Sequence, residues 1–500
     1  MGKEESGKLE WRINVPGGTS KPLEPTIGLF SKIWLGLNAL VLGFVFRVRH
    51  FFGKAWDIGV AEPRKVMHCL KVGIALTFVS LFYYMRPLYD GVGGNAIWAV
   101  MTVVVVFEYT VGATLNKSIN RATATFLAGS LGLGVHWVAT QSGQKFEPVI
   151  IGLFVFILAS ATTFSRFIPS VKARFDYGAL IFILTFSLVS VSGYRVDKLF
   201  ELAHQRVVTI AIGTSLCILI SMLISPVWAG LELHLLINRN LEKLADSLDV
   251  CISEYFRENN GDPNKEGEDQ IRKLQGYKCV LNSKAAEDSM ANFARWEPPH
   301  GHFNFRHPWK QYLKIGTAIR SCAYCIETLT GCVDFGVQTS DLLSNQLKDV
   351  CVKLSSASTS VLRELSSTVK CMTRSPKLDF LVGEMNSAIQ ELQNASTTAP
   401  QQLVRSSPQQ TVDTSNNFPG EHINGTEEAT IMQVLPLATL VTLIMEVAAR
   451  IELVVDAVDE LATLAKFKQA VDTKPGRVQP KNEQISYNQN QEAIGAVQML

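Results

Sequence analysis

The chain has 500 residues, of which 47% are hydrophobic and only 18% are charged. This composition supplies more apolar surface than one soluble core requires and too little charge to solvate it, so membrane-spanning segments are expected. The 47 Lys and Arg residues nearly balance the 45 Asp and Glu residues, which excludes a strong general attraction to nucleic acid.

Residues 1–60 are predicted to form an N-terminal cytosolic segment. Within it, 27–46 is apolar apart from Lys32 and a few Gly, Ser and Asn residues, and Arg47, Arg49 and Lys54 follow directly. This pattern favours a helix lying at the membrane interface. Its length would also permit a seventh span, and both readings stay open.

Six strongly hydrophobic segments make 61–230 the predicted transmembrane domain. Each has about the 17 to 25 residues that a spanning helix requires. The segments are 66–85, 96–114, 122–140, 148–164, 177–193 and 207–229. Lys and Arg are concentrated before the first segment and in the connections 115–121 and 165–176, so these are predicted to be cytoplasmic. The basic connection 194–206 is the exception to this alternation.

After Gly230 the composition becomes charged and compatible with helices. Apolar residues from Ile237 to Tyr255 recur at three- and four-residue steps, and further helices are expected at about 308–333, 342–371, 377–394 and 428–467. The polar stretch 395–427 reads as a disordered linker and 470–500 as a disordered tail. The predicted fold class is an all-α membrane protein, with six transmembrane helices followed by a cytosolic helical bundle at 231–500.

Several cations lie within or at the ends of the hydrophobic segments. An unpaired charge in hydrocarbon costs a few kcal/mol or more, so each is a candidate functional group. A ring of such cations would lower the electrostatic barrier for an anion. The alternative is that each one is an anchor reaching to the interface. The residues are Lys71, Arg121, Arg166, Lys172 and Arg206.

Glu108 is the one carboxylate placed well inside a predicted span. It is expected to pair with a cation as a structural partner, and binding a proton or gating the path are the alternatives.

Enzyme signatures do not compete with a transport function. No P-loop or Rossmann glycine loop is present, and no cofactor is indicated. Cys322 and Cys325 have the spacing of a redox motif, but they fall in a helical pattern and are read as residues of a helix face.

Long sequence runs resemble those of the plant aluminium-activated malate transporter family. In the cytosolic half, Trp296-Glu297-Pro298 and Ala448-Ala-Arg450 are similar to further family motifs. The resemblance therefore covers about 60–470. The membrane runs are EPRK at 62–65, NAIWAVMTVVVVFE at 95–108, VGATL at 111–115, RFIP at 166–169, FDYG at 175–178 and PVWAG at 226–230.

The resemblance implies a passive, often voltage-dependent anion channel built as a homodimer. Members conduct malate and, to varying degrees, chloride, nitrate and sulfate. The cations named above would line the anion path, and Trp296, Glu297 and Pro298 would form a regulatory motif. The proline pair at 298–299 also permits a plain helix stop.

Activation by aluminium would require clustered oxygen ligands, and the weak candidates are Asp90, Asp197 and Glu201. Ordinary solvated loop charges explain these acids better, so no metal site is predicted. The compact termini favour the plasma membrane over the vacuolar membrane. Two other functions remain as alternatives: a secondary exporter of organic acids that uses Glu108 to couple proton movement, and a non-conducting regulatory subunit.

Overall fold

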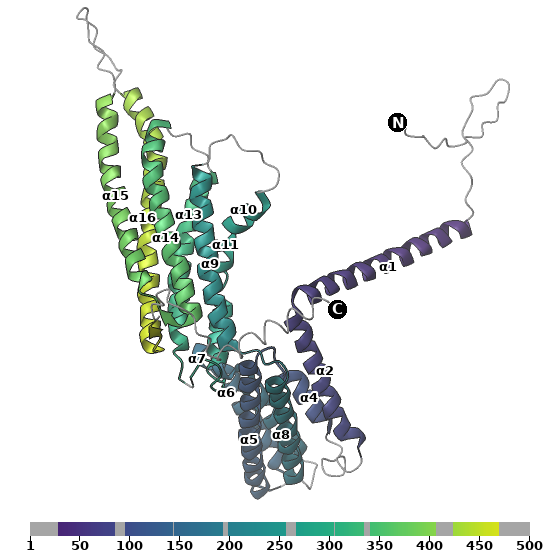
Figure 1. The fold of residues 1–500 in the computed structure, drawn as a ribbon. Helices are drawn as coiled ribbons and strands as arrows, with labels where there is room; N and C mark the ends of the chain where they lie inside the picture. The colour runs from purple at the N-terminus through teal and green to yellow at the C-terminus, as the bar shows by residue number, and fades with distance from the viewer. Residues whose placement is uncertain are drawn as a thin grey trace, which may run out of the picture. The chain divides into compact units, whose positions relative to one another are not determined.

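The structure is a computed structural model of the chain, and it describes residues 29–85, 96–143, 145–193, 199–256, 267–304, 306–334, 341–406 and 424–469. These residues are almost entirely α-helical, which confirms the predicted all-α class (Figure 1). The chain divides into two compact units, Met1–Phe78 and Val79–Leu500, and each is described by itself.

The first unit contains α1 (Leu29–Ala61) and most of α2 (Pro63–Tyr84). Pro63 has no N–H to continue the hydrogen bonding of α1, so the two helices are separate. Glu62 lies between them, where its N–H bonds to Ile58 O (2.9 Å) and its carboxylate pairs with Lys65 (2.8 Å). The predicted helix 27–46 is therefore the first part of a longer helix that continues to Ala61.

Five apolar helices follow: α4 (Ala96–Val106), α5 (Val111–Gln141), α6 (Glu147–Ser165), α7 (Pro169–Gly193) and α8 (Leu199–Leu223). In the described part of the chain, four stretches are long and apolar enough to cross a membrane, one each in α5, α6, α7 and α8. The apolar part of α4 is shorter. An all-α membrane protein is therefore confirmed, and the count of six spans remains a prediction.

The boundary between the second and third predicted spans is wrong. The helix predicted over 96–114 ends at Val106, and 115–121, predicted as a loop, lies inside α5. Local capping explains the difference, because Thr110 has an extended backbone and its side chain accepts a hydrogen bond from Ala113 N (3.3 Å). Hydropathy continues across this break and cannot reveal it.

The described residues after 228 contain five long helices: α9 (Ala229–Tyr255), α13 (Trp309–Asp334), α14 (Asp341–Cys371), α15 (Lys377–Ser406) and α16 (Asn424–Leu464) (Figure 1). Three short helices, α10 (Gly267–Leu274), α11 (Gly276–Leu281) and α12 (Lys284–Ala294), pack beside α9. Strands β1 (Thr373–Arg374) and β2 (Lys468–Gln469) pair in parallel.

The long helices coincide with the predicted ones, and the short helices were not predicted. Helix α15 continues to Ser406 and α16 starts at Asn424, so both enter the stretch 395–427 predicted as a linker. Ala399, Gln401 and Gln402 are good helix formers within that polar composition, and they flank Pro400, which supplies no N–H. The central part of the predicted linker, 407–423, and the predicted tail 470–500 lie outside the described residues.

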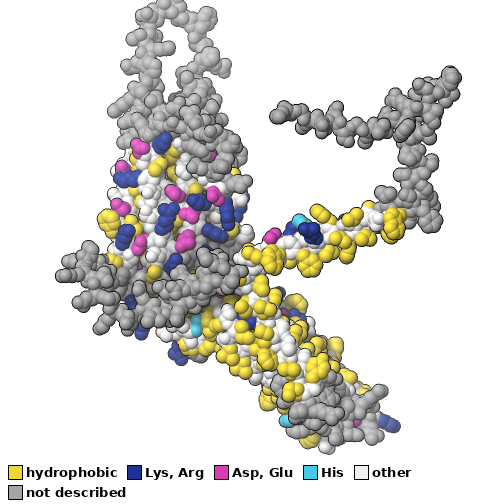
Figure 2. Space-filling view, turned by 45° about the vertical axis from the view of Figure 1, so that its right-hand side comes forward, with side chains coloured by type: hydrophobic (Ala, Val, Ile, Leu, Met, Phe, Trp, Pro, Cys, Tyr) yellow, Lys and Arg dark blue, Asp and Glu magenta, His cyan; other side chains and the backbone are white. Residues whose placement is uncertain are grey.

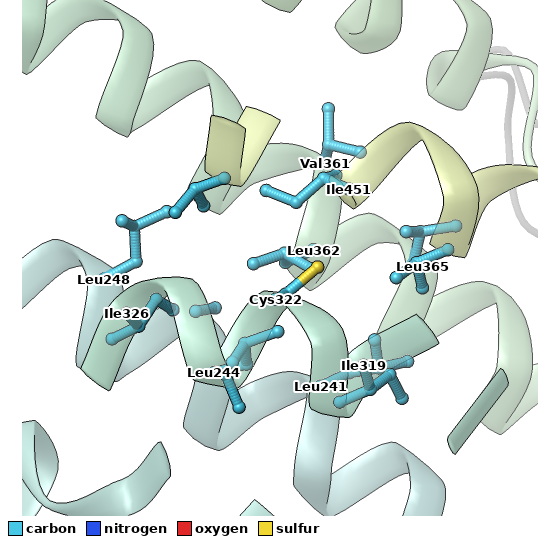
Figure 3. Packing of buried hydrophobic residues seen from close by; sticks show 14 of the residues in the cluster. Leu241, Leu244, Leu248, Ile319, Cys322, Ile326, Val361, Leu362, Leu365 and Ile451 are labelled. Carbon is cyan, nitrogen blue, oxygen red and sulfur yellow. The ribbon is translucent and has the colours of Figure 1, made fainter. Parts of the chain in front are cut away.

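One continuous hydrophobic core joins α9, α13, α14 and α16. Figure 3 shows Cys322 of α13 among leucine, isoleucine and valine side chains from these helices. Cys322 is fully buried, and burial raises the pKa of its thiol far above the usual range. A raised pKa disfavours the reactive thiolate, so the prediction that Cys322 and Cys325 are residues of a helix face is confirmed.

A buried polar cluster lies at the start of α13. The hydroxyl of Tyr312 is 3.0 Å from His234 Nδ1 and 3.2 Å from His307 Nε2, and Tyr312 is fully buried. Burial, and secondarily the neighbouring His234, lowers the pKa of His307 to about 4 from its ordinary 6.5. Burial likewise lowers the pKa of His234. Both imidazoles are therefore neutral in the folded domain near pH 7.

The pKa of His307 predicts an acid-sensitive stability. The unfolded chain takes up the proton as the pH falls through 6.5, whereas the folded chain resists until about pH 4, so stability decreases across this window. The expected loss is on the order of 3 kcal/mol. The thermal midpoint of the purified protein should fall less with acidification in His307→Gln than in wild type. His50→Gln, which changes an exposed histidine of α1, is the control, and equal pH slopes in all three proteins would contradict this assignment.

Candidate functional site

The interior between α4, α5, α7 and α8 contains many buried polar side chains. Apolar helices that bury polar groups against one another, rather than only apolar ones, are typical of a path for a polar solute. The buried residues are Thr102 of α4, Asn116, Ser118, Asn120, Arg121 and Thr125 of α5, Thr185 and Ser190 of α7, and Arg206, Thr209, Thr214 and Ser221 of α8.

Arg121 lies in the middle of this interior rather than at a helix end. It is 6% exposed, and its Nη1 donates to the hydroxyl of Tyr177 on α7 (3.1 Å). Ser118, Arg121 and Thr125 are three and four residues apart, so they share one face of α5. Ser118 Oγ, Arg121 Nε and Thr125 Oγ1 are buried and have no hydrogen-bond partner among the described residues. This face of α5 thus presents polar atoms that a ligand can use.

Arg206 approaches the same interior from α8. Its side chain is 8% exposed, and its guanidinium lies over the ring of Trp98 on α4, 4.0 Å from the centroid. It also lines a cavity of about 260 Å³ together with Thr125, Gly129 and Thr185. The arginine is therefore held by a flat aromatic surface and leaves its donors directed elsewhere.

Thr125, on the same face of α5 as Arg121, lines one cavity with Arg206, so the charges of Arg121 and Arg206 interact. Among the residues that the structure describes, no carboxylate forms an ion pair with either one. Two like charges buried together repel each other more strongly than they would in water. An anion between them would relieve this repulsion, so the pair is a candidate anion site.

A larger cavity of about 620 Å³ opens where α5 and α7 meet α12. Its cations are Lys117, Lys172, Arg174 and Arg295, against the acids Asp176 and Asp288. Asn292 of α12 donates to Ala173 O of α7 (2.9 Å) and holds the two sides together. The excess of cations makes this cavity attractive to anions.

The five predicted pathway cations do not have equivalent surroundings. Arg121 and Arg206 lie together in the helix interior, and Lys172 lines the larger cavity. Arg166 lies between α6 and α7 in a two-point ion pair with Asp176 (2.8 and 3.3 Å), so its charge is already neutralised. Lys71 is 3% exposed and belongs to the Met1–Phe78 unit.

Glu108 is not inside a spanning helix, which corrects its predicted position. It lies in the connection between α4 and α5, where its carboxylate pairs with Lys117 of α5. Its backbone N–H also donates a hydrogen bond to the hydroxyl of Thr114 (3.1 Å). An ion pair with Lys117 agrees with the structural role expected for Glu108. The sequence did not suggest Lys117 as the partner, because 115–121 read as a loop.

Glu297 joins the apolar helices to the C-terminal helical bundle. Its Oε1 accepts hydrogen bonds from Ala229 N (2.6 Å) and Gly112 N (3.1 Å), and its Oε2 accepts one from Gly230 N (3.0 Å). These N–H groups belong to the first turns of α9 and α5, where no partner exists within the helix. One buried carboxylate therefore caps two helices, and its charge complements both positive helix ends.

Glu297 is enclosed by aromatic rings and by closely packed backbone. Trp228 stacks on His300 with ring centroids 4.0 Å apart, and His300 Nε2 is 3.9 Å from Glu297 Oε2. Burial raises the pKa of Glu297 and outweighs the backbone N–H donors, which act in the opposite direction. A side chain at Gly112 would overlap the carbonyl of Phe293, so this position requires glycine for close approach.

Trp296 and Pro298 position Glu297 rather than line a cavity. Helix α12 ends at Ala294, the Trp296 N–H bonds to Phe293 O (2.9 Å), and His300 Nδ1 lies 2.8 Å from Pro298 O. The motif thus both ends a helix and presents the capping carboxylate.

The weak candidates for cation sensing gain no support. Asp90 and Asp197 lie outside the described residues, and only the helical backbone of Glu201 is described. Among the described residues, no group of three or more His, Cys, Asp or Glu side chains could hold a metal ion.

Long apolar helices around buried cations, joined to a charged helical bundle, define an integral membrane protein with a polar interior. The profile of the family described as "Aluminium activated malate transporter" matches residues 56–422. The chain belongs to this family, which is one of transporters and not of enzymes.

Relatives with this family name cover almost the whole chain. Aluminum-activated malate transporter 10 of Arabidopsis thaliana is 56% identical over 97% of this chain and 100% of its own length. Aluminum-activated malate transporter 2 of Arabidopsis thaliana is 43% identical over 84% of this chain and 79% of its own length. Aluminum-activated malate transporter 1 of Triticum aestivum is 40% identical over 90% of this chain and 93% of its own length.

The double cap at Glu297 predicts a large loss of stability in Glu297→Ala. Three buried N–H groups would lose their acceptor, at about 1–3 kcal/mol for each unsatisfied group, so we expect a loss of about 3 kcal/mol or more. Denaturant unfolding of the purified full-length protein measures it. Glu384→Ala, which removes an exposed carboxylate from α15, is the matched control. Similar unfolding of both variants would show that Glu297 does not hold the two helices.

Proposed function

We propose that this chain forms a passive anion channel that conducts malate and inorganic anions, including chloride, nitrate and sulfate. The observation that carries the proposal is the pair of buried arginines, Arg121 and Arg206, which repel each other and have no carboxylate partner in the described part of the chain. A permeating anion supplies the missing negative charge, and it must bind weakly enough to leave. The names of the relatives support malate as one such anion.

The route proposed for the anion begins at the basic cavity between α5, α7 and α12. Its volume of about 620 Å³ is within the range of small-molecule sites, and Lys172 lies in its wall. The anion then passes along the face of α5 that carries Ser118, Arg121 and Thr125, and reaches Arg206. Lys71 of α2, in the Met1–Phe78 unit, is also proposed as an anion-path residue.

The remaining features follow from the family. The channel is proposed to be a homodimer with six spans per subunit, to depend on voltage, and to lie in the plasma membrane. The cavity with Lys172 is next to α12, so it is proposed as the cytosolic mouth of the pore. The Trp296-Glu297-Pro298 motif is proposed to couple the cytosolic bundle to the pore, because Glu297 caps the helix that carries Arg121.

An exporter driven by protons is the second candidate, and Glu108 would have to exchange the proton. The ion pair of Glu108 with Lys117 favours a structural role instead. A non-conducting subunit would make no use of two buried arginines that have no carboxylate partner among the described residues. Both alternatives are distinguished from a channel by electrical recording.

Voltage-clamp recording of the chain expressed alone, with malate and then chloride as the main anion, tests the proposal. We expect currents that fall about tenfold in Arg121→Ala and in Arg206→Ala, which corresponds to ~1.4 kcal/mol of lost stabilisation. Arg206→Lys should keep more current because it keeps the charge. Arg166→Ala should have a smaller effect, since Asp176 already neutralises Arg166.

Surface expression is measured for every variant, and Arg272→Ala, which removes an exposed arginine from α10, is the control. Currents that survive both arginine substitutions would overturn the proposed route. Slow electroneutral malate flux that is lost in Glu108→Gln would establish the exporter, and no current or flux at all would establish a subunit that requires a partner.

A further inference from the structure

The second part of α1 is an amphipathic helix. At 100° per residue, the side chains of residues 47–58 separate into two arcs, and Val60 and Ala61 at the end of the helix fall on the polar side. The polar arc contains Arg47, Arg49, His50, Gly53, Lys54 and Asp57. The opposite arc contains Val48, Phe51, Phe52, Ala55, Trp56 and Ile58. The first part of α1, which the sequence favours as an interfacial helix, lacks this division, because polar residues are few there.

The apolar arc of residues 47–61 is open in the structure. Phe51 is 68% exposed, Phe52 65% and Trp56 74%. Figure 2 shows the same arrangement, with yellow apolar side chains and a group of blue and cyan basic ones on the surface of α1. Three large rings on one side of a helix are far more apolar surface than a single exposed residue, so this arc requires an apolar partner.

The polar arc indicates which partner that is. It holds three cations, one histidine and one acid, so its net charge is positive. Anionic phospholipid headgroups carry the complementary charge, and they lie directly above an apolar layer. Trp and Phe on one face and Arg and Lys on the other match these two layers in the same order. A soluble protein partner would have to provide both layers at this spacing.

The connection to α2 brings this helix to a bilayer. Only Glu62 separates α1 from α2, and α2 is the first predicted span. The chain before this span is predicted to be cytoplasmic, and the cytoplasmic leaflet carries the anionic lipids.

We propose that residues 47–61 lie flat in the cytoplasmic leaflet, where Arg47, Arg49 and Lys54 bind anionic phospholipid headgroups and Phe51, Phe52 and Trp56 insert among the acyl chains. Pro63 separates this helix from α2, so the position of residues 47–61 in the leaflet sets the depth at which α2 enters the membrane. The inference concerns lipid binding and stands independently of the anion that the chain conducts.

Fluorescence of the full-length protein in vesicles tests this arrangement. The environment-sensitive amino acid Anap is introduced singly as Phe52→Anap on the apolar arc and as Asp57→Anap on the polar arc, a matched pair on the same helix. Vesicles contain phosphatidylcholine alone or phosphatidylcholine with phosphatidylserine. We expect emission at position 52 to be blue-shifted relative to position 57, and brominated acyl chains to quench position 52 about twofold more strongly.

The charge of the polar arc is tested in the same vesicles. Phosphatidylserine should strengthen the quenching at position 52, and the triple variant Arg47→Glu, Arg49→Glu, Lys54→Glu should remove this dependence on lipid charge. High salt should weaken it as well, because salt screens charges at the surface.

Three results would overturn the proposal. Equal quenching of positions 52 and 57 by brominated chains would mean that this part of α1 spans the bilayer. A blue shift at position 52 without quenching by lipid would mean that protein, from this chain or a second copy, covers the apolar arc. Quenching of position 52 by aqueous iodide would mean that the arc stays in water.

Discussion

The carboxylate of Glu297 is the contact on which the geometry of the second unit depends. Two helices start beside it, α5 of the apolar half and α9 of the C-terminal bundle, and both need an acceptor for the N–H groups of their first turns. Because these N–H groups are buried, leaving one without an acceptor is costly, so the two helices stay together as long as the carboxylate holds both. Arg121 follows Gly112 on α5 by less than three turns, and its position is therefore fixed from the same point.

The interior of the membrane half tolerates positive charge because neutral side chains surround the buried arginines. Neutral groups offset part of the desolvation free energy of the two buried arginines: the hydroxyl of Tyr177 contacts Arg121, and the ring of Trp98 contacts Arg206. Neither of these groups cancels a full charge as a carboxylate would. Arg166 shows the contrast, because Asp176 satisfies it with two bonds and leaves little attraction for another anion. A cation held by neutral partners remains available to a mobile anion, whereas a cation in a two-point ion pair does not.

Much of the fold follows from periodicity, and the errors lie where periodicity carries no information. The long helices of the C-terminal bundle were predictable because residues such as Leu241, Leu244 and Leu248 repeat on one face and form the core. The break at 107–110 was not predictable from hydropathy, because its signal is the single capping side chain of Thr110. With the break misplaced, Glu108 was assigned to a span and Lys117 to a loop. The short helices α10, α11 and α12 lack a long apolar stripe and were missed for that reason.

The candidate site was predictable in its residue types but not in its pairings. Buried cations in apolar segments are conspicuous in any sequence, so Arg121 and Arg206 were identified at once. Their proximity depends on how α5 and α8 pack, and the neutralisation of Arg166 depends on a residue ten positions further along the chain. The sequence indicates the role of Glu297 more strongly than it indicates the proximity of the two arginines or the neutralisation of Arg166. Gly112 in the run VGATL and Gly230 in the run PVWAG precede it in the sequence. Both glycines lie where a side chain would collide with a neighbouring element. The sequence pattern of this shared cap is therefore a glycine at the start of each of two helices and one carboxylate further along the chain.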